Sequence, residues 1–320
     1  MKLCDEFSLK LPSLPALMNK VGFAILLLLV ALCYSSRAFA EGDSSNVNDT
    51  ADSVKIVKID TTKPPPPDSA YIARASDPNW WKRKVENKAF NVGEYLKFQV
   101  RYGMIRAGTA IIEIADTIDY NGAKCFKVVS TARSNAFVST FYKVRDTVFS
   151  YIDYDGIYSH YFSKRLNEGK YHKTQETFFD QRRHLAITGE DTIRTYSFVQ
   201  DAFSALYYAR TLELEEGADL KIDNHTDRKN YPLKVIVHGR DSVEVPAGKF
   251  DCIVVEPVMR AEGIFQAKGS IKIWLTNDRY KIPVKMQTEV FFLGSIHADL
   301  VEFKRGVFPD ELKQVEDERK

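Results

Sequence analysis

The chain of 320 residues lacks most of the features that identify common protein classes from sequence. Its formal net charge is only +2, it has four cysteines, and no apolar run beyond residue 40 reaches the length of a membrane span. Without a basic run it lacks the field that attracts phosphates, so we expect no nucleic-acid partner. A composition of 44% hydrophobic and 28% charged residues excludes collagen, coiled coil and low complexity, and predicts a folded globular protein.

The first 40 residues have the order of a secretory signal peptide. Lysines precede an apolar run over residues 21–34, and Ala38-Phe39-Ala40 follows it. A run of 14 residues is too short to cross a bilayer, which needs about 20. We therefore expect cleavage after Ala40 and export to the periplasm. A lipoprotein acylated at Cys33 is the less favoured alternative, because Leu32 occupies a position that normally requires a small residue.

The rest of the chain divides into three parts. Residues 41–79 are polar and contain Pro64-Pro65-Pro66-Pro67, which predicts a disordered leader with a stiff spacer, or alternatively a ligand for a proline-recognition module. Residues 309–320 read as a charged, solvated tail that does not resemble the last strand of an outer-membrane barrel, so we expect no integral membrane protein after cleavage. Residues 80–308 are long enough for a single domain, or for two tightly joined halves.

Alternating apolar and polar residues dominate residues 80–308 and predict antiparallel strands. Turn signals such as Asn121-Gly122 and Asp155-Gly156 separate several of them. The first predicted series comprises Glu94–Tyr102, Thr109–Ile118, Cys125–Ala132, Val144–Ile152, Ile157–Leu166, Tyr171–Phe179, His184–Thr188 and Thr192–Phe198. The second comprises Leu233–His238, Ser242–Val245, Phe250–Val258, Ser270–Thr276, Ile282–Phe292 and Ile296–Phe303.

One segment between the two series has helical spacing. Asp201–Leu214 places apolar residues three and four apart, with Asp201 as a cap; Asn135–Tyr142 is either a shorter helix or an irregular crossover. A meander of this many strands hides its edges by curling. The sequence thus predicts a mainly β fold, a curved antiparallel sheet that forms a barrel or half barrel with one helix packed between two strand series. A barrel of this size can hold a small ligand.

Several segments, taken in order, resemble the DUF3108 family of exported bacterial proteins. They are Tyr102-Gly103-Met104-Ile105-Arg106-Ala107-Gly108-Thr109, Val144-Arg145-Asp146, Ser204-Ala205-Leu206-Tyr207-Tyr208, Val245-Pro246-Ala247-Gly248-Lys249-Phe250-Asp251-Cys252 and Ile273-Trp274-Leu275-Thr276-Asn277-Asp278. The resemblance covers about residues 88–304. It implies an exported β-rich domain of unknown function, with a curved sheet like that of the LolA/LolB lipoprotein carriers, and it transfers no catalytic residues. The motifs also have structural readings, such as turns at Gly103 and Gly248.

Metal and nucleophile chemistry are not favoured. His160, His172 and His184 are spaced by twelve, but a hairpin closed by Glu168-Gly169 pairs His172 with Arg165 and His160 with Thr177. The first two histidines then lie about 16 Å apart along the strands, too far for one metal ion. His225, His238 and His297 have no ligand-like spacing, and no nucleophile-elbow, zinc-protease or phosphate-loop motif occurs. We expect no metal and no cofactor.

Two groups of polar residues keep their alternatives open. Asp146 and Asp153 could act as an acid–base pair on a glycosidic bond, although Asp153 and Asp155 also fit a tight turn, and an inward Asp146 could be a polar anchor in a cavity. Cys125 and Cys252 are the cysteines left after cleavage, and form either a disulfide or two separate buried thiols.

Aromatic residues are abundant and often adjacent. Pairs such as Phe178-Phe179, Tyr207-Tyr208 and Phe291-Phe292 place one ring on each face of a strand. The leading hypothesis is a non-catalytic carrier for a lipid or another apolar or amphiphilic ligand. The residues expected at its ligand site are Asp146, Phe149, Tyr151, Phe203, Tyr207 and Trp274. The alternatives are an envelope scaffold that docks a protein partner, and a carboxylate-dependent hydrolase of glycans or lipids.

Overall fold

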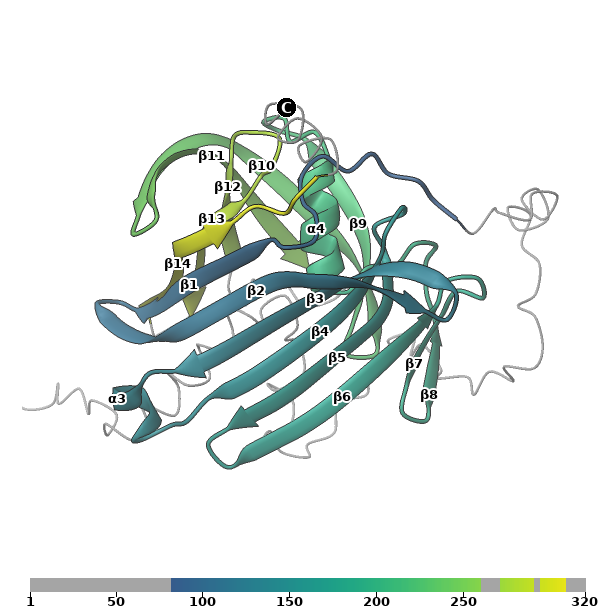
Figure 1. Cartoon of the computed structure of the whole chain (residues 1–320), viewed down its shortest axis with the longest axis horizontal. Helices are drawn as coiled ribbons and strands as arrows, with labels where there is room; N and C mark the ends of the chain where they lie inside the picture. Colours follow the sequence, from purple (N-terminus) through teal and green to yellow (C-terminus); the bar gives the residue numbers. More distant parts are fainter. Residues whose placement is uncertain (1–81, 260–270, 291–293, 309–320) are drawn as a thin grey trace, which may run out of the picture.

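The computed structural model describes residues 82–259, 271–290 and 294–308, which form fourteen strands and two helices (Figure 1). The expected signal peptide, leader and charged tail, and the pair Phe291-Phe292, lie outside the described residues. The first strands are β1 (Tyr95–Tyr102), β2 (Ile105–Tyr120), β3 (Ala123–Ser134), β4 (Arg145–Asp153), β5 (Ser159–Glu168), β6 (Tyr171–Asp180), β7 (Leu185–Thr188) and β8 (Asp191–Arg194). The remaining strands are β9 (Asp219–Thr226), β10 (Lys229–Val245), β11 (Gly248–Met259), β12 (Ile271–Thr276), β13 (Pro283–Val290) and β14 (Gly294–Lys304). The helices are α3 (Ala136–Ser139) and α4 (Ala202–Thr211).

All fourteen strands belong to one antiparallel sheet in the order β8-β7-β6-β5-β4-β3-β2-β1-β14-β13-β12-β11-β10-β9. The two predicted series are therefore meanders, and the pairing of β1 with β14 joins them. Alternation in the sequence sets the faces: in β1, Leu96, Phe98 and Val100 are buried while their neighbours are partly exposed. At Asn121-Gly122 both residues have positive φ, 54° and 79°, as a two-residue hairpin turn requires.

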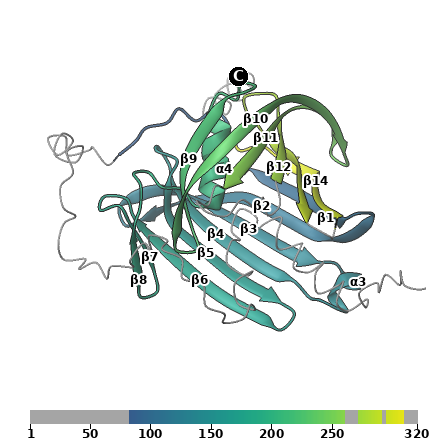
Figure 2. The ribbon, with the colours of Figure 1, turned by 180° about the vertical axis from the view of Figure 1, so that it is seen from behind.

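The sheet curls until its two ends nearly meet (Figures 1 and 2). A short segment before α4 bridges the gap, because Gln200 forms an isolated parallel bridge with Asn224 of β9. On its other side, the Ser159 N–H at the start of β5 donates to Val199 O at 3.3 Å. The mainly β, barrel-like fold expected from the sequence is confirmed.

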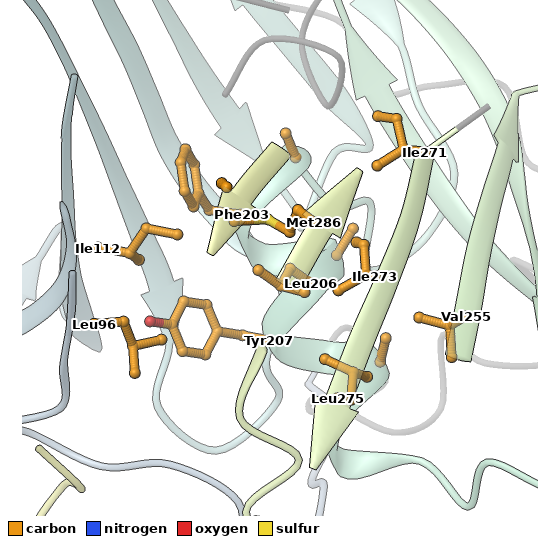
Figure 3. Packing of buried hydrophobic residues seen from close by; sticks show 14 of the residues in the cluster. Leu96, Ile112, Phe203, Leu206, Tyr207, Val255, Ile271, Ile273, Leu275 and Met286 are labelled. Atoms are coloured by element: carbon orange, nitrogen blue, oxygen red, sulfur yellow. The ribbon is translucent and has the colours of Figure 1, made fainter. Parts of the chain in front are cut away.

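Helix α4 lies between the two strand series, as predicted, and packs inside the sheet. Phe203, Leu206 and Tyr207 point into the interior, between residues of β1 and β2 and residues of β11, β12 and β13 (Figure 3). Asp201 caps the helix as expected, with a reciprocal capping box to Ser204. Helix α3 is the shorter alternative expected for residues 135–142.

Parts of the second meander differ from the prediction. The predicted strands Leu233–His238 and Ser242–Val245 are parts of the single strand β10, which has a register shift between Val237 and Gly239. Gly239, at φ 107°, forms a β-bulge, and the gap predicted between the two strands begins there. Strand β9 was not expected, because its sequence, DLKIDNHT, is rich in residues that strands disfavour. The pairing of Asn224 with Gln200 and the neighbouring strand β10 supply the contacts that its composition does not.

The register predicted for the β5–β6 hairpin is wrong by two residues. Glu168 pairs with Tyr171, so His172 lies opposite Asn167 rather than Arg165, and Thr177 lies opposite Phe162 rather than His160. The turn consists of Gly169 and Lys170, and Gly169 has φ 55°. A shift of two residues leaves each side chain on the same face, so the assignment of inner and outer residues is unaffected.

Candidate functional site

Helix α4 is fixed inside the sheet at its N-cap, Asp201. The buried Asp201 carboxylate accepts hydrogen bonds from the N–H groups of Phe203 and Ser204 at 2.8 and 3.0 Å. It also accepts from the hydroxyls of Ser150 on β4 and Ser159 on β5, at 2.7 and 2.5 Å. Burial raises the pKa of Asp201, although these four donors oppose the rise. One carboxylate thus fixes the helix start against two strands.

The other end of α4 is held by a buried ion pair. Arg210 donates to both carboxylate oxygens of Glu94, just before β1, at 2.7 and 2.6 Å. The Tyr207 hydroxyl donates to the same carboxylate at 3.1 Å, and the guanidinium also donates to the carbonyls of Ala89 and Tyr280. Burial alone would lower the pKa of Arg210, but the charge of Glu94 raises it. Because each group has a partner, the pair can remain ionised inside the protein.

The inner face of the sheet extends well beyond α4. A helix of ten residues spans about 15 Å, whereas the twelve residues of β3 span about 40 Å. Asp146 lies four residues before Ser150 on β4, about 13 Å away along the strand, and Ser150 contacts the start of the helix. We call the buried inward residues of this region the distal inner wall: Ala110, Ser130, Ala132, Asp146, Val148, Lys164 and Leu166.

The distal inner wall follows from strand register. Ala110 pairs with Ala132, and Ala132 with Asp146. One step along, Ser130 pairs with Val148, and Val148 with Lys164. Side chains on paired residues of one face lie next to one another. The wall therefore combines small side chains, aliphatic side chains and a few polar groups.

Two carboxyl groups meet at the end of this wall. Asp146 accepts a hydrogen bond from the Asn167 N–H at 2.8 Å and is hydrogen-bonded to Glu168. Burial raises the pKa of Asp146 to about 6, although both hydrogen bonds oppose the rise. The Tyr142 hydroxyl donates to Glu168 at 3.3 Å.

The one cation of the distal inner wall is paired. Lys164 Nζ lies 2.5 Å from Asp227, which is in the turn between β9 and β10, and both side chains are buried. The ion pair links β5 to the β9–β10 hairpin and helps to close the barrel. Ser130 differs from these groups: its hydroxyl is buried and has no hydrogen-bond partner among the described residues. A buried polar group without a partner typically marks a missing water or ligand, or costs about 1–3 kcal/mol.

The structure does not gather the six predicted ligand residues into one site. Asp146, Phe203 and Tyr207 face the interior. Phe149 and Tyr151 alternate with the buried residues of β4 and so lie on its outer face. Trp274 lies between the inward residues Ile273 and Leu275 and is covered from outside, since its indole N–H donates to Asp241 at 2.7 Å and Lys285 lies over its ring.

Outward aromatic residues form a group of their own on the first meander. Tyr151 has ring centroids 5.2 Å from Tyr120 and 4.8 Å from Tyr161. Phe178 extends this outer aromatic cluster, with its ring 5.3 Å from that of Tyr161. Phe178 is 42% exposed while Phe179 is 6% exposed, which confirms that the adjacent pair divides between the two faces.

The pair proposed for a hydrolase is separated. Asp146 and Asp153 lie seven residues apart on β4, about 23 Å, and outside the range of about 5–10 Å for paired catalytic carboxyls. Asp153 instead accepts from the N–H groups of Asp155 and Gly156 and contacts His160 at 2.9 Å. Asp153 therefore stabilises a tight turn, which was the structural alternative to a catalytic role. A polar surface hollow of about 230 Å³, lined partly by Asp251, Asp278 and Arg305, lies away from both residues.

The cysteines and histidines are separate. Cys125 on β3 and Cys252 on β11 are buried free thiols, so the disulfide alternative is wrong and the alternative of two thiols holds. Six strand pairings separate β3 from β11 in the sheet. Within the described residues no group of histidine, cysteine and carboxylate side chains could hold a metal ion. In the same residues no helix has the length and apolar character needed to cross a membrane.

Several important residues were not identified from the sequence. Glu94 and Arg210 are 116 positions apart, and no local pattern indicates their contact. Lys164 did carry a signal, because it shares its parity on β5 with Phe162 and Leu166, and an inward lysine needs a buried partner. The position of that partner, Asp227, depends on closure of the sheet.

A nearly closed antiparallel sheet that holds one helix against part of its inner face defines a barrel-like β protein. The chain belongs to the family described as "Protein of unknown function (DUF3108)", which matches residues 97–301. No curated protein matches it.

Three solved structures are similar over most of their length. The first, a beta-barrel-like protein of the domain of unknown function DUF1849 from Brucella abortus, is 11% identical, with coverage of 68% of this chain and 100% of that chain and a TM-score of 0.48. A Bacteroides fragilis protein with a YmcC-like fold is 13% identical, with coverages of 69% and 100% and a TM-score of 0.34. A protein described as a lipoprotein from Parabacteroides distasonis is 12% identical, with coverages of 70% and 100% and a TM-score of 0.33.

Proposed function

We propose that this chain is an exported, non-catalytic carrier of the cell envelope, with a single domain over residues 80–308 that binds an amphiphilic molecule along the distal inner wall. The signal-like pattern of the first 40 residues supports export. The observation that carries the binding role is the composition of the wall beyond α4. Small and aliphatic residues there surround a buried Ser130 hydroxyl that has no hydrogen-bond partner among the described residues.

The wall also indicates the chemistry of the ligand. Ala110, Ala132, Val148 and Leu166 offer an apolar surface suited to a hydrocarbon chain. The cation of Lys164 is already paired with Asp227, so it is not available to neutralise a charged head group. A ligand with a hydrocarbon chain and a neutral polar group, such as a hydroxyl or amide, satisfies both conditions, since that group can bond to Ser130.

Mass spectrometry of organic extracts tests this proposal. The full-length chain, exported and purified without detergent, should release one amphiphile in a constant molar ratio, absent from a mock purification. The variant Ala132→Leu fills the distal inner wall and should release much less. Thr131→Leu is the matched control, because it adds similar bulk to the neighbouring residue on the opposite face of β3. Circular dichroism confirms that both variants fold.

The results that would contradict the carrier are equally concrete. The carrier proposal is contradicted if the wild-type extract contains no amphiphile above the mock level. It is also contradicted if Ala132→Leu and the wild type release equal amounts of amphiphile. If Ala132→Leu does not fold, the stoichiometry of the wild-type extract decides alone.

The outer aromatic cluster favours a second candidate, an envelope scaffold that docks a protein partner. Phe178 is the exposed member of this cluster, and clustered exposed aromatic rings are typical of protein interfaces. An empty extract together with a partner crosslinked at position 178 would favour the scaffold over the carrier.

A further inference from the structure

Large apolar side chains are exposed at one end of the barrel, on two neighbouring loops. Met104 and Ile105, at the β1–β2 turn, are 97% and 50% exposed. Phe137 and Phe141, in and after α3, are 63% and 54% exposed. Both loops project from the same end of the sheet in both views (Figures 1 and 2). We call these four residues the apolar tips.

Local structure holds the tips outward. Tyr102 pairs with Ile105, which leaves Gly103 and Met104 as a two-residue turn, and Gly103 has φ 53°, where glycine is favoured. The Met104 side chain therefore has no strand to pack against. Phe137 and Phe141 contact each other edge to face, with ring centroids 5.8 Å apart.

A single asparagine joins the two loops. Asn135, the cap of α3, accepts from the Val138 N–H at 2.8 Å and donates through its side chain to Arg106 O at 2.6 Å. Its own N–H donates to Ala107 O at 2.9 Å. The apolar tips are thus parts of one preorganised surface rather than two independent loops.

Exposed cations surround the tips. We call them the basic rim: Arg106, Arg133, Lys143, Arg145 and Lys170. The loop stretches 103–109 and 133–145 contain no acidic residue. Two carboxyl groups next to rim residues in sequence, Asp146 beside Arg145 and Glu168 two positions before Lys170, are buried. This end of the barrel is therefore locally positive although the whole chain is nearly neutral.

Two arginines of the basic rim are paired across neighbouring strands. Arg133 on β3 lies directly opposite Arg145 on β4. Like charges directly opposite each other on neighbouring strands destabilise a sheet. An anionic partner placed over both guanidinium groups would remove this repulsion.

We propose that the apolar tips and basic rim dock this end of the barrel on an anionic lipid surface. The tips project from the ends of two loops, a shape suited to insertion between lipids. Side chains of this kind enter the interface between head groups and acyl chains, and neighbouring cations contact lipid phosphates. The proposal is independent of the ligand in the interior, and it would bring the barrel end to a source of amphiphiles.

Vesicle sedimentation of the exported, purified chain tests the docking. The protein should bind vesicles of phosphatidylcholine and phosphatidylglycerol, bind pure phosphatidylcholine far more weakly, and lose affinity as salt rises. The variant Arg106→Gln/Arg133→Gln/Arg145→Gln should lose at least tenfold in affinity, since each cation near such a surface contributes about fivefold. Met104→Ser/Phe137→Ser should also lose at least tenfold.

Matched controls separate docking from general charge or hydrophobicity. Arg182→Gln/Arg194→Gln removes two exposed arginines distant from the tips, and Phe178→Ser removes an exposed ring elsewhere; both should bind vesicles as the wild type does. Thermal unfolding verifies that each variant folds.

Three outcomes would overturn the docking proposal. These are absence of vesicle binding by the wild type, equal binding to neutral vesicles, and equal loss of binding in the control variants. Mass spectrometry of the same variants keeps the two proposals apart, because rim variants should retain any bound amphiphile. If the rim variants lose vesicle binding but keep the amphiphile, the docking proposal is supported and the carrier proposal is unaffected. If the wild type binds vesicles but holds no amphiphile, the carrier proposal is contradicted and the docking proposal stands.

Discussion

Replacing Arg210 with leucine should destabilise the protein more than any comparable surface change. The substitution removes two charge-assisted hydrogen bonds of 2.7 and 2.6 Å. Among the described residues, the Tyr207 hydroxyl is then the one remaining donor to the Glu94 carboxylate, and Glu94 is 2% exposed. Each hydrogen bond to a charged group contributes about 1.5–3 kcal/mol. The expected loss is therefore about 3–5 kcal/mol, the range found when one partner of a buried ion pair is removed. In a domain of this size that corresponds to a Tm lower by roughly 6–20 °C.

Urea unfolding of three variants measures this prediction. Arg210→Leu should show the full loss, and Arg182→Leu, at an exposed arginine, should change stability by less than about 0.5 kcal/mol. The double variant Glu94→Leu/Arg210→Leu should be more stable than Arg210→Leu alone, because it no longer buries an unpaired carboxylate. The reasoning is refuted if Arg210→Leu loses less than about 1 kcal/mol, or if the double variant is the less stable of the two.

Three further predictions follow from buried groups. Because burial raises the pKa of Asp146 to about 6 from 3.8, its ionisation should lower the free energy of unfolding by roughly 3 kcal/mol between about pH 4 and about pH 6; urea unfolding of Asp146→Asn should show a flatter profile there, and a parallel profile would contradict the assignment. Lys164→Met should cost about 3 kcal/mol by leaving Asp227 unpaired and should speed amide exchange in the β9–β10 hairpin; unchanged exchange would show that the pair does not close the barrel. Burial raises the pKa of both Cys125 and Cys252 to about 12, so peptide mapping after alkylation near pH 8 should find both thiols protected in the folded chain and labelled after unfolding, whereas rapid labelling of the native protein would count against their burial.

Local pattern predicted most of the strands, because alternation and turn residues act within a few positions. Phe98 and Val100 fall on the inner face as their parity requires, and Asn121-Gly122 forms the expected turn. Strand β9 depends instead on pairing with β10 and with Gln200. A strand whose own composition is unfavourable forms only when distant partners are in place, so its sequence gives little indication of it.

The site was less predictable than the fold. Asp146 was considered from the sequence as an inward polar anchor that would need a partner, but no pattern indicated that Glu168 would contact it. That contact depends on the pairing of β5 with β4 and on the bridge between Val144 and Glu168, and no register was predicted for these two strands. Trp274 alternates with the inward residues Ile273 and Leu275, so its ring lies on the outer face. There its indole N–H donates to Asp241, 33 positions away, a contact that no local pattern indicates.

A crystal structure of the protein purified without detergent tests the carrier most directly. Continuous elongated electron density should run along the inner face of β3, β4 and β5, with a polar atom about 3 Å from Ser130 Oγ. An interior filled by protein side chains alone, with the Ser130 hydroxyl bonded to another residue of the chain, would contradict the account.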